Sequence, residues 1–245
     1  MTAAHSLSLL TLDSIKQSFK LKENHSNGDQ PWKILESSKF GPVGSIRLFE
    51  ANEHISKMVY VSIGVEAFQL DSHMIFAFTN EDSPLPHFTL DSVATGPHYA
   101  YHLDLIPKVD LGSNLQYMKE IYQPITEVFE NRANIEGLSP AVLSPTQLAV
   151  MSPWMLANRA TESAFDQVGK LVSQYLAHWT DLVKNGPSAE LKQDLAKKSV
   201  SIKQRDTDNR AMLFSKEIDP VWDKIEPLIG AESGELIRNL LKKVN

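Results

Sequence analysis

The sequence predicts an α+β fold, with one antiparallel sheet and helices packed on its faces. Short runs rich in β-branched and aromatic residues follow one another after Gly41. The links between them are short, which favours antiparallel neighbours, because parallel strands need a crossover of a dozen residues or more. After Pro107 apolar residues recur at three- and four-residue steps instead. Strands followed by helices in one chain are typical of the α+β class.

The N-terminal part of the sequence predicts a helix, a polar loop and five strands. The helix is expected around Leu12 to Leu21, and the polar stretch KENHSNGDQPW follows it. The predicted strands cover residues 44–51, 57–65, 72–79, 86–94 and 98–106. With their short links, they predict an antiparallel meander from Gly41 to Pro107.

The C-terminal part predicts mainly helices. NLQYMKEIYQPITEVFE has a helical pattern interrupted by Pro124, and LSPTQLAVM, residues 143–151, is expected to add one more strand. A long amphipathic helix follows, ends at the sequence NGP and carries the apolar residues Phe165, Val168, Val172, Tyr175, Trp179 and Leu182. Further helices are expected from about Ser188 to residue 216 and in GELIRNLLKK. No linker composition interrupts the chain, so we expect one domain covering residues 1–245.

The composition excludes several kinds of chemistry. The chain has 245 residues, a net charge of −6 and no cysteine, which excludes disulfides, thiol nucleophiles and cysteine-ligated clusters. It carries no GxGxxG, no P-loop motif and no paired-histidine metal spacing, so neither a bound cofactor nor a metal is expected. The acidic charge argues against a nucleic-acid partner, and no apolar run approaches the roughly 20 residues that cross a bilayer. With no signal peptide recognised, the cytoplasm is the expected location, or the plastid stroma for a mature plant form.

The strand around Asp91 has a mostly polar face. Residues two apart in a strand share a face. The residues sharing a face are His87, Thr89, Asp91 and Val93 on this strand, and His98, Ala100, His102 and Asp104 on the next. Two such faces can lie side by side on one surface of the sheet. Either this surface is simply solvated, or helices cover it and Asp91 lines a cavity. In a cavity, burial would raise the pKa of Asp91, and a protonated carboxyl could give up a proton.

Three further positions are notable. Asp219 precedes Pro220, where the chain is pushed out of the helical conformation, so its carboxylate can cap a turn or point back over the sheet. His73 is predicted on a strand near the middle of the sheet, where packing or surface exposure is the simpler explanation. Ser144 and Ser152 precede prolines, as at ordinary turns, and no nucleophile elbow or Ser–His–Asp spacing supports a hydrolase.

Four sequence blocks resemble those of one enzyme family. The blocks are PHFTLDSVATG, HLDLIPKVDL, LSPTQLAV and RDTDNRAMLFSKEIDPVWDKIEPLIGAESGELIRNLL. In this order they are similar to blocks of the red chlorophyll catabolite reductases and, more widely, of the ferredoxin-dependent bilin reductase superfamily. The resemblance covers roughly residues 40–243, whereas the first forty residues match no block.

This resemblance implies a three-layer α/β/α sandwich that binds an open-chain tetrapyrrole between the sheet and the C-terminal helices. Such enzymes hold no cofactor of their own. Reduced ferredoxin supplies electrons one at a time, and protons from protein and solvent complete the reduction through a substrate radical. The resemblance therefore implies two partners, ferredoxin and a linear tetrapyrrole.

The resemblance also implies three catalytic residues. Asp91 stands where the family has a strand carboxylate beside the substrate; plant red chlorophyll catabolite reductases have Glu there, and bilin reductases usually have Asp. Asp219 stands where many members have a second proton-donating Asp ahead of a proline. Some bilin reductases have a His one strand earlier, near His73. The spacing here is off by one, which turns His73 to the other face unless a bulge intervenes.

A substrate-binding set follows from the same comparison. Bilin reductases can bind a propionate through an Arg near the end of the LSPTQLAVM segment, where this chain has Met151. A substitute is expected among the other arginines, because a guanidinium can hold a carboxylate with two bonds. The predicted set is Thr89, Ser144, Met151, Arg159, Arg205 and Arg210.

A basic dock for acidic ferredoxin is expected in LAKKSVSIKQR, at Lys197, Lys198, Lys203 and Arg205. A solvated helix face is the simpler explanation of the same charges.

The sequence thus predicts a ferredoxin-dependent reductase of an open-chain tetrapyrrole, as a monomer or homodimer. The substrate is either a red chlorophyll catabolite, which overall block similarity favours, or a biliverdin-type bilin, which Asp91 favours. The alternative is a non-catalytic tetrapyrrole carrier on the same fold, which would keep the pocket and not need the two acids.

Overall fold

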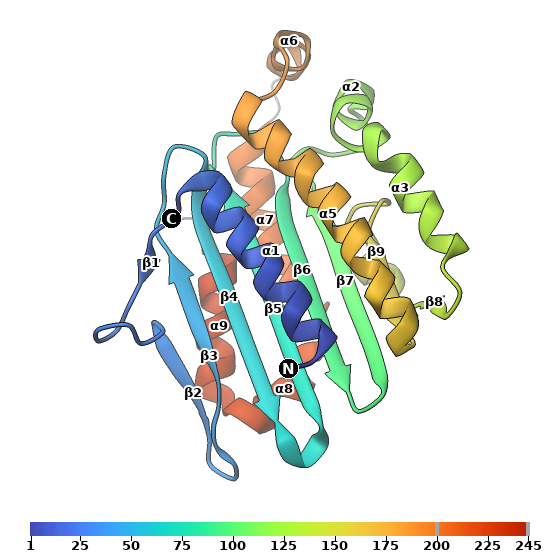
Figure 1. Ribbon diagram of the computed structural model, residues 1–245. Coiled ribbons are helices and arrows are strands. Elements are labelled where there is room, and N and C mark those ends of the chain that lie inside the picture. Colours follow the sequence, from blue (N-terminus) through green and yellow to red (C-terminus); the bar gives the residue numbers. More distant parts are fainter. Residues whose placement is uncertain (199–200, 244–245) are drawn as a thin grey trace.

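A computed structural model describes residues 1–198 and 201–243, and within them nine strands form one antiparallel sheet (Figure 1). The strands are β1 (Glu23–Asn24), β2 (Lys33–Ser37), β3 (Gly41–Phe49), β4 (Ile55–Val65), β5 (Leu70–Thr79), β6 (His87–Thr95), β7 (His98–Ile106), β8 (Leu138–Pro140) and β9 (Leu156–Ala160). Their order is β1-β3-β4-β5-β6-β7-β9-β8, and β2 pairs with β3 beyond this path. The meander predicted from the short links is therefore confirmed as β3 to β7.

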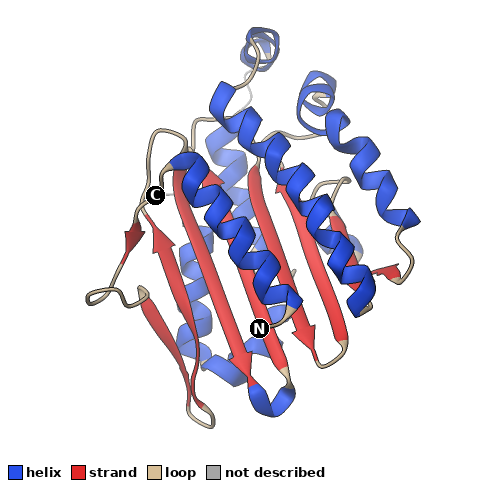
Figure 2. Cartoon of the chain, viewed as in Figure 1, coloured by secondary structure: helices blue, strands red, loops and turns tan. Residues whose placement is uncertain are grey.

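Helices cover both faces of the sheet, as the blue and red ribbons of Figure 2 show. On one face lie α1 (Ala3–Phe19) and α5 (Glu162–Asn185); on the other lie α7 (Ile202–Leu213), α8 (Val221–Ile229) and α9 (Ala231–Lys242). The remaining α-helices are α2 (Leu115–Tyr117), α3 (Thr126–Asn131), α4 (Pro145–Val150) and α6 (Ala189–Lys197). This arrangement confirms the three-layer α/β/α sandwich. No helix in the described part of the chain is both long and apolar enough to cross a membrane.

Each face of the sheet has its own hydrophobic core, because the central strands bury side chains on both sides. Leu12 of α1 and Trp179 of α5 pack with Phe88 and Leu103 on one face. Trp222 of α8 and other side chains of the C-terminal helices pack against the opposite face. The long helix α5 ends where predicted, at Gly186, whose φ of 73° suits glycine better than any other residue.

Several sequence expectations differ from the structure. The N-terminal helix, expected around Leu12 to Leu21, is α1 and begins at Ala3, and the first forty residues, expected as helix and loop, also contain β1 and β2. LSPTQLAVM, predicted as a strand, contains helix α4: Ser144 and Gln147 form a capping box, and Pro145 occupies the first turn. The strand added beyond β7 is instead β9, LANRA, which the sequence analysis missed. The helix predicted from Ser188 corresponds to α6 and α7, and residues 199 and 200 of that prediction lie outside the described residues.

Pro124 interrupts the helical segment after β7, as its missing N–H predicts. Here α2 continues as a π-helical turn at Met118–Tyr122 and a 3-10 turn at Gln123–Ile125 before α3 begins.

Candidate functional site

A cavity of about 490 Å³ lies between the sheet and its C-terminal helical layer. Strands β4 to β7 and β9 form its floor, and α4, the end of α7 and α8 contribute its cover. Its wall is mainly apolar and includes Met74, Phe76, Leu143, Phe214, Ile225 and Leu228. The volume lies within the roughly 300–1,000 Å³ range of small-molecule sites.

Asp91 and His102 lie beside each other on the cavity floor. They are directly paired residues of β6 and β7, so their side chains project from the same face of the sheet. His102 Nδ1 lies 3.6 Å from Asp91 Oδ2. Burial lowers the pKa of His102, but the adjacent Asp91 carboxylate and the charges of Asp104 and Asp219 outweigh burial and raise it overall. The alternation of polar residues predicted this shared face, and the structure confirms that the face is covered.

Asp219 approaches the cavity from the opposite wall. It directly precedes Pro220 and α8, and its Oδ1 accepts a hydrogen bond from the Val221 N–H at 3.0 Å. Burial raises the pKa of Asp219 to about 6; this hydrogen bond opposes the shift, and the charge of Asp91 adds to it. The two acids therefore interact although they are far apart in the sequence. At neutral pH a small fraction of Asp219 is protonated and able to donate a proton.

Asp104 lies on the cavity side of β7 and anchors the segment that follows α4. It is fully buried, shares a face with His102, and accepts hydrogen bonds from the Ser152 N–H at 2.9 Å and from the Ser152 hydroxyl. Burial raises its pKa against the effect of His102 and these bonds. Asp104 thereby ties the segment after α4, including Met151, to β7. The sequence analysis placed Asp104 on this face without assigning it a role.

Six residues that line the cavity each carry a buried polar atom with no hydrogen-bond partner among the described residues. These atoms are Thr89 Oγ1, Asp91 Oδ1, Tyr101 Oη, His102 Nε2, Asn158 Oδ1 and Trp222 Nε1. Thr89 and Trp222 are each 1% exposed. A buried polar group without a partner costs about 1–3 kcal/mol. The set includes both donors and acceptors, so the cavity suits a ligand that offers both kinds of group along an otherwise apolar body.

The structure brings four of the predicted site residues to this cavity and not the others. Thr89, Asp91, Met151 and Asp219 line it. His73, Ser144, Arg159, Arg205 and Arg210 do not. Ser144 instead caps α4.

His73 lies on the opposite face of the sheet. Strands β5 and β6 pair without a bulge, with His73 opposite Ser92 and Met74 opposite Asp91. The offset of one position therefore turns His73 toward α1, as strand alternation requires. There its Nδ1 lies 2.7 Å from the hydroxyl of Tyr60 and its Nε2 lies 2.7 Å from Asp71 Oδ1. His73 does not reach the cavity as a proton donor.

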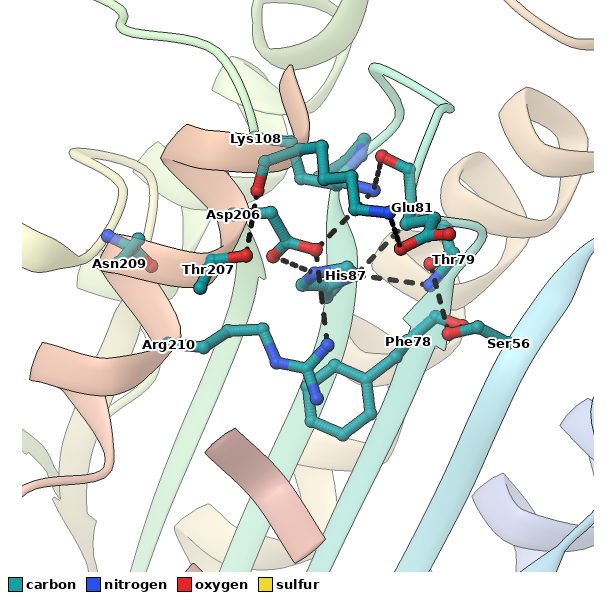
Figure 3. A network of polar contacts seen from close by, with 12 residues as sticks. Ser56, Phe78, Thr79, Glu81, His87, Lys108, Asp206, Thr207, Asn209 and Arg210 are labelled. Atoms are coloured by element: carbon teal, nitrogen blue, oxygen red, sulfur yellow. Dashed lines mark hydrogen bonds and ion pairs between the residues drawn. The ribbon is translucent and has the colours of Figure 1, made fainter. Parts of the chain in front are cut away.

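Arg210 is buried in a polar network that joins α7 to the sheet (Figure 3). Its guanidinium lies over the ring of Phe78, 3.8 Å from the ring centroid, and donates to the carbonyls of Leu241 and Lys243. Burial lowers its pKa to about 10, against the effect of Asp206. These contacts explain why Arg210 cannot hold a substrate propionate.

Asp206 is the anion of this network. Its Oδ1 lies 2.7 Å from His87 Nε2, and its Oδ2 lies 3.7 Å from Lys108 Nζ and 3.9 Å from Arg210 Nη1. His87 Nδ1 accepts the N–H of Thr79, so Nε2 carries the ring proton and donates it to Asp206. Burial lowers the pKa of His87 to about 4, and the ring is neutral at pH 7. The network fixes the cover of the cavity to its floor.

Arg159 lies on the face of the sheet that forms the cavity floor, although it does not line the cavity itself. It pairs with Ala100, which lines the cavity, and therefore projects from the same face of the sheet at its exposed margin. Lys224 of α8, which the sequence analysis did not single out, lines the cavity and is exposed. Arg159 and Lys224 are the candidates to bind an acidic group of a ligand at the opening of the cavity.

Comparison with known proteins gives a structural likeness only. No family model and no curated protein sequence matches the chain. The fold is similar to that of tomato phytochromobilin synthase, solved in complex with biliverdin, with a TM-score of 0.70 at 17% identity over 96% of this chain and 80% of that chain. PcyX superposes with a TM-score of 0.48 at 13% identity, over 99% of this chain and 98% of that one. The chain therefore shares the fold of phytochromobilin synthase.

Proposed function

We propose that this protein is a ferredoxin-dependent reductase of an open-chain tetrapyrrole, with Asp91 and Asp219 as proton donors. The observation that carries the proposal is the placement of these two acids on facing walls of one apolar cavity. The fold shared with a biliverdin-bound enzyme supports it.

The cavity matches the chemistry of a linear tetrapyrrole. Such a pigment is an extended apolar body with pyrrole N–H donors, lactam carbonyl acceptors and acidic side groups. The N–H groups suit Asp91 and Thr89, a carbonyl suits the buried indole N–H of Trp222, and an acidic side group suits Arg159 or Lys224 at the margin.

Two electrons and two protons saturate one double bond. Each electron from reduced ferredoxin raises the basicity of the conjugated pigment, so a carboxyl in contact can then protonate a specific carbon. Proton transfer needs contact within about 3 Å or through one water, so the positions of Asp91 and Asp219 select the bond that is reduced.

An anaerobic assay tests the proposal. The protein is mixed with biliverdin or with red chlorophyll catabolite, a reduced ferredoxin system is added, and the absorption spectrum is followed. We expect a time-dependent blue shift with one of the two pigments that requires ferredoxin. A spectrum of bound pigment that never changes would contradict the reductase and support a carrier.

The pKa of Asp219, about 6, predicts how the rate depends on pH. The donor is the protonated carboxyl, whose fraction falls tenfold per unit once the pH exceeds the pKa. We expect the single-turnover rate to fall between pH 6 and pH 8, and Asp219→Asn to lose this decline. Measurement uses preformed protein–pigment complex and excess reduced ferredoxin. A rate that is constant from pH 5 to 8 would count against Asp219 as donor.

A ferredoxin dock at the end of α6 and the start of α7 is also part of the proposal. Lys198 pairs with Asp194 at 2.7 Å and Lys203 pairs with Glu81 at 2.9 Å, which offsets their charges. Lys197 and Arg205 have no ion-pair partner within 4.0 Å among the described residues. These two cations are the ones we expect to meet an acidic partner.

Reversing these two charges should slow electron delivery. For Lys197→Glu with Arg205→Glu, we expect the rate at limiting ferredoxin to fall by about tenfold at low salt, and the deficit to shrink at high salt as screening increases. Lys33→Glu with Lys170→Glu, on β2 and α5, changes the net charge equally and serves as the control. Equal slowing in both double variants would place the dock elsewhere.

A further inference from the structure

Three potential metal ligands meet on the face of the sheet opposite the cavity. They are His5 at the start of α1 and Asp71 and His73 on β5, and one ligand atom from each lies within 4.8 Å of the others. The rings of His5 and His73 are in contact, with centroids 4.7 Å apart and planes inclined by 40°. Because Asp71 and His73 are two apart in a strand, they project to the same side, toward α1. The ligands come from segments far apart in the sequence, so no spacing motif revealed them.

The sheet leaves room for an ion beside these groups. The residues paired with Asp71 are Gly64 and Ala94, and those paired with His73 are Ser62 and Ser92, so all four cross-strand neighbours are small. His73 is buried, whereas His5 and Asp71 are partly exposed. An ion can therefore reach the group from solvent, and a water molecule can complete its coordination.

The Asp71–His73 pair needs little adjustment to hold an ion. His73 Nε2 and Asp71 Oδ1 lie 2.7 Å apart, as a hydrogen bond. Two ligands of a tetrahedral zinc ion, with bonds near 2.0 Å, are about 3.3 Å apart, so this pair would widen by about 0.6 Å. The ligand atom of His5, which lies within 4.8 Å of the other two, would move closer by up to about 1.5 Å.

Outer contacts already orient two of the ligands. Tyr60 places its hydroxyl 2.7 Å from His73 Nδ1, and Thr2 donates to Asp71 Oδ2 at 2.5 Å. A histidine that binds a metal through one ring nitrogen usually donates from the other to such a partner. The Tyr60 hydroxyl, already within hydrogen-bond distance of Nδ1, can accept that hydrogen bond. Arg47, the cation near Tyr60, is already paired with Glu23 at 2.6 Å.

We propose that His5, Asp71 and His73 bind one divalent transition-metal ion of the zinc class, with water as fourth ligand. Two imidazoles and a carboxylate without thiolate suit Zn²⁺ and Co²⁺ rather than Mg²⁺ or Ca²⁺. The ion would join α1 to β5 on the side remote from the tetrapyrrole cavity. The proposal does not depend on the reductase activity.

Metal titration of the chelator-treated protein tests it. We expect one equivalent of Zn²⁺ to bind, Co²⁺ to give the intense visible absorption of a tetrahedral site, and Zn²⁺ at a hundred times its Kd to raise Tm by about 5–10 °C. His5→Gln, Asp71→Asn and His73→Gln should each weaken binding at least tenfold, and Tyr60→Phe by about tenfold. His98→Gln, which removes an exposed histidine at the start of β7, should leave binding unchanged.

If the β5 variants do not fold, His5→Gln is the deciding variant, because the ring of His5 contacts His73 without hydrogen bonding to it. Without an ion, the Tyr60–His73–Asp71 contacts are a hydrogen-bonded chain that does not need His5. Zn²⁺ binding that is absent, substoichiometric or equally tight after His5→Gln would overturn the metal site.

Discussion

Asp219→Asn and Asp91→Asn, each made singly, are expected to bind pigment normally and to lower the rate of its reduction by about 10²- to 10⁴-fold. Each substitution removes the transferable proton while keeping the shape of the side chain. In Asp219→Asn the amide oxygen of the new side chain can still accept the Val221 N–H, so the turn before α8 is retained. Loss of the Asp91 charge also lowers the pKa of His102, which depends on that partner.

Two measurements separate these effects. Pigment affinity is obtained from absorbance titration, and single-turnover reduction is followed anaerobically, with electron paramagnetic resonance to detect a substrate radical that forms and stalls. Asp223→Asn, an exposed acid of α8, is the matched control. Turnover at the wild-type rate in both Asp91→Asn and Asp219→Asn would refute the proton-donor roles even if the protein is a reductase.

Asp206→Asn is expected to lower the free energy of unfolding by about 3–5 kcal/mol at pH 7. The variant keeps an acceptor for His87 but leaves Lys108 and Arg210 buried without their shared anion. The pKa of Asp206 points the same way. Burial raises the pKa of Asp206. The hydrogen bond with His87 and the charges of His87, Lys108 and Arg210 outweigh burial and lower this pKa to about 2. An acid whose pKa falls from its ordinary 3.9 to about 2 on folding contributes about 2.6 kcal/mol to the free energy of unfolding above pH 4. This contribution is lost as the pH falls through 2.

Urea unfolding of wild type, Asp206→Asn and Asp208→Asn measures this difference. Asp208 is an exposed acid on the same helix and gives the baseline for losing one charge from α7. The gap between the Asp206 variant and wild type should narrow as the pH is lowered toward 2. A difference within about 0.5 kcal/mol of the Asp208 control, the usual range for surface substitutions, would show that the buried cations are satisfied without Asp206.

Local patterns predicted the sheet well. The meander from β3 to β7 follows from short links and alternating residues, which are properties of neighbouring positions. The strand predicted for LSPTQLAVM was wrong because its apolar content suits either state. Ser144, which forms a helix capping box with Gln147, was interpreted as a turn residue. LANRA was missed because it is a short segment whose strand state comes from pairing with β7, which is distant in sequence.

Only those site residues could be predicted that strand alternation places on one face or that the family resemblance identifies. Alternation put Asp91 and His102 on one surface, and the block around Asp219 suggested a second acid. Neither could show that Arg210 is held by the carbonyls of Leu241 and Lys243, because those contacts depend on how α7 packs against α9. Strand alternation also indicated that His73 would project from the face of the sheet opposite Asp91.

The margins of the sheet bear on self-association. One margin ends in β8, only three residues long and containing Pro140, which has no N–H to offer another chain. At the other, β1 has two residues, and β2 shifts register between Leu35 and Glu36. Bulges, prolines and short lengths are the means by which natural sheets avoid recruiting a further strand. Neither margin thus offers a long, straight template for the edge-to-edge aggregation to which a wide antiparallel sheet is otherwise prone.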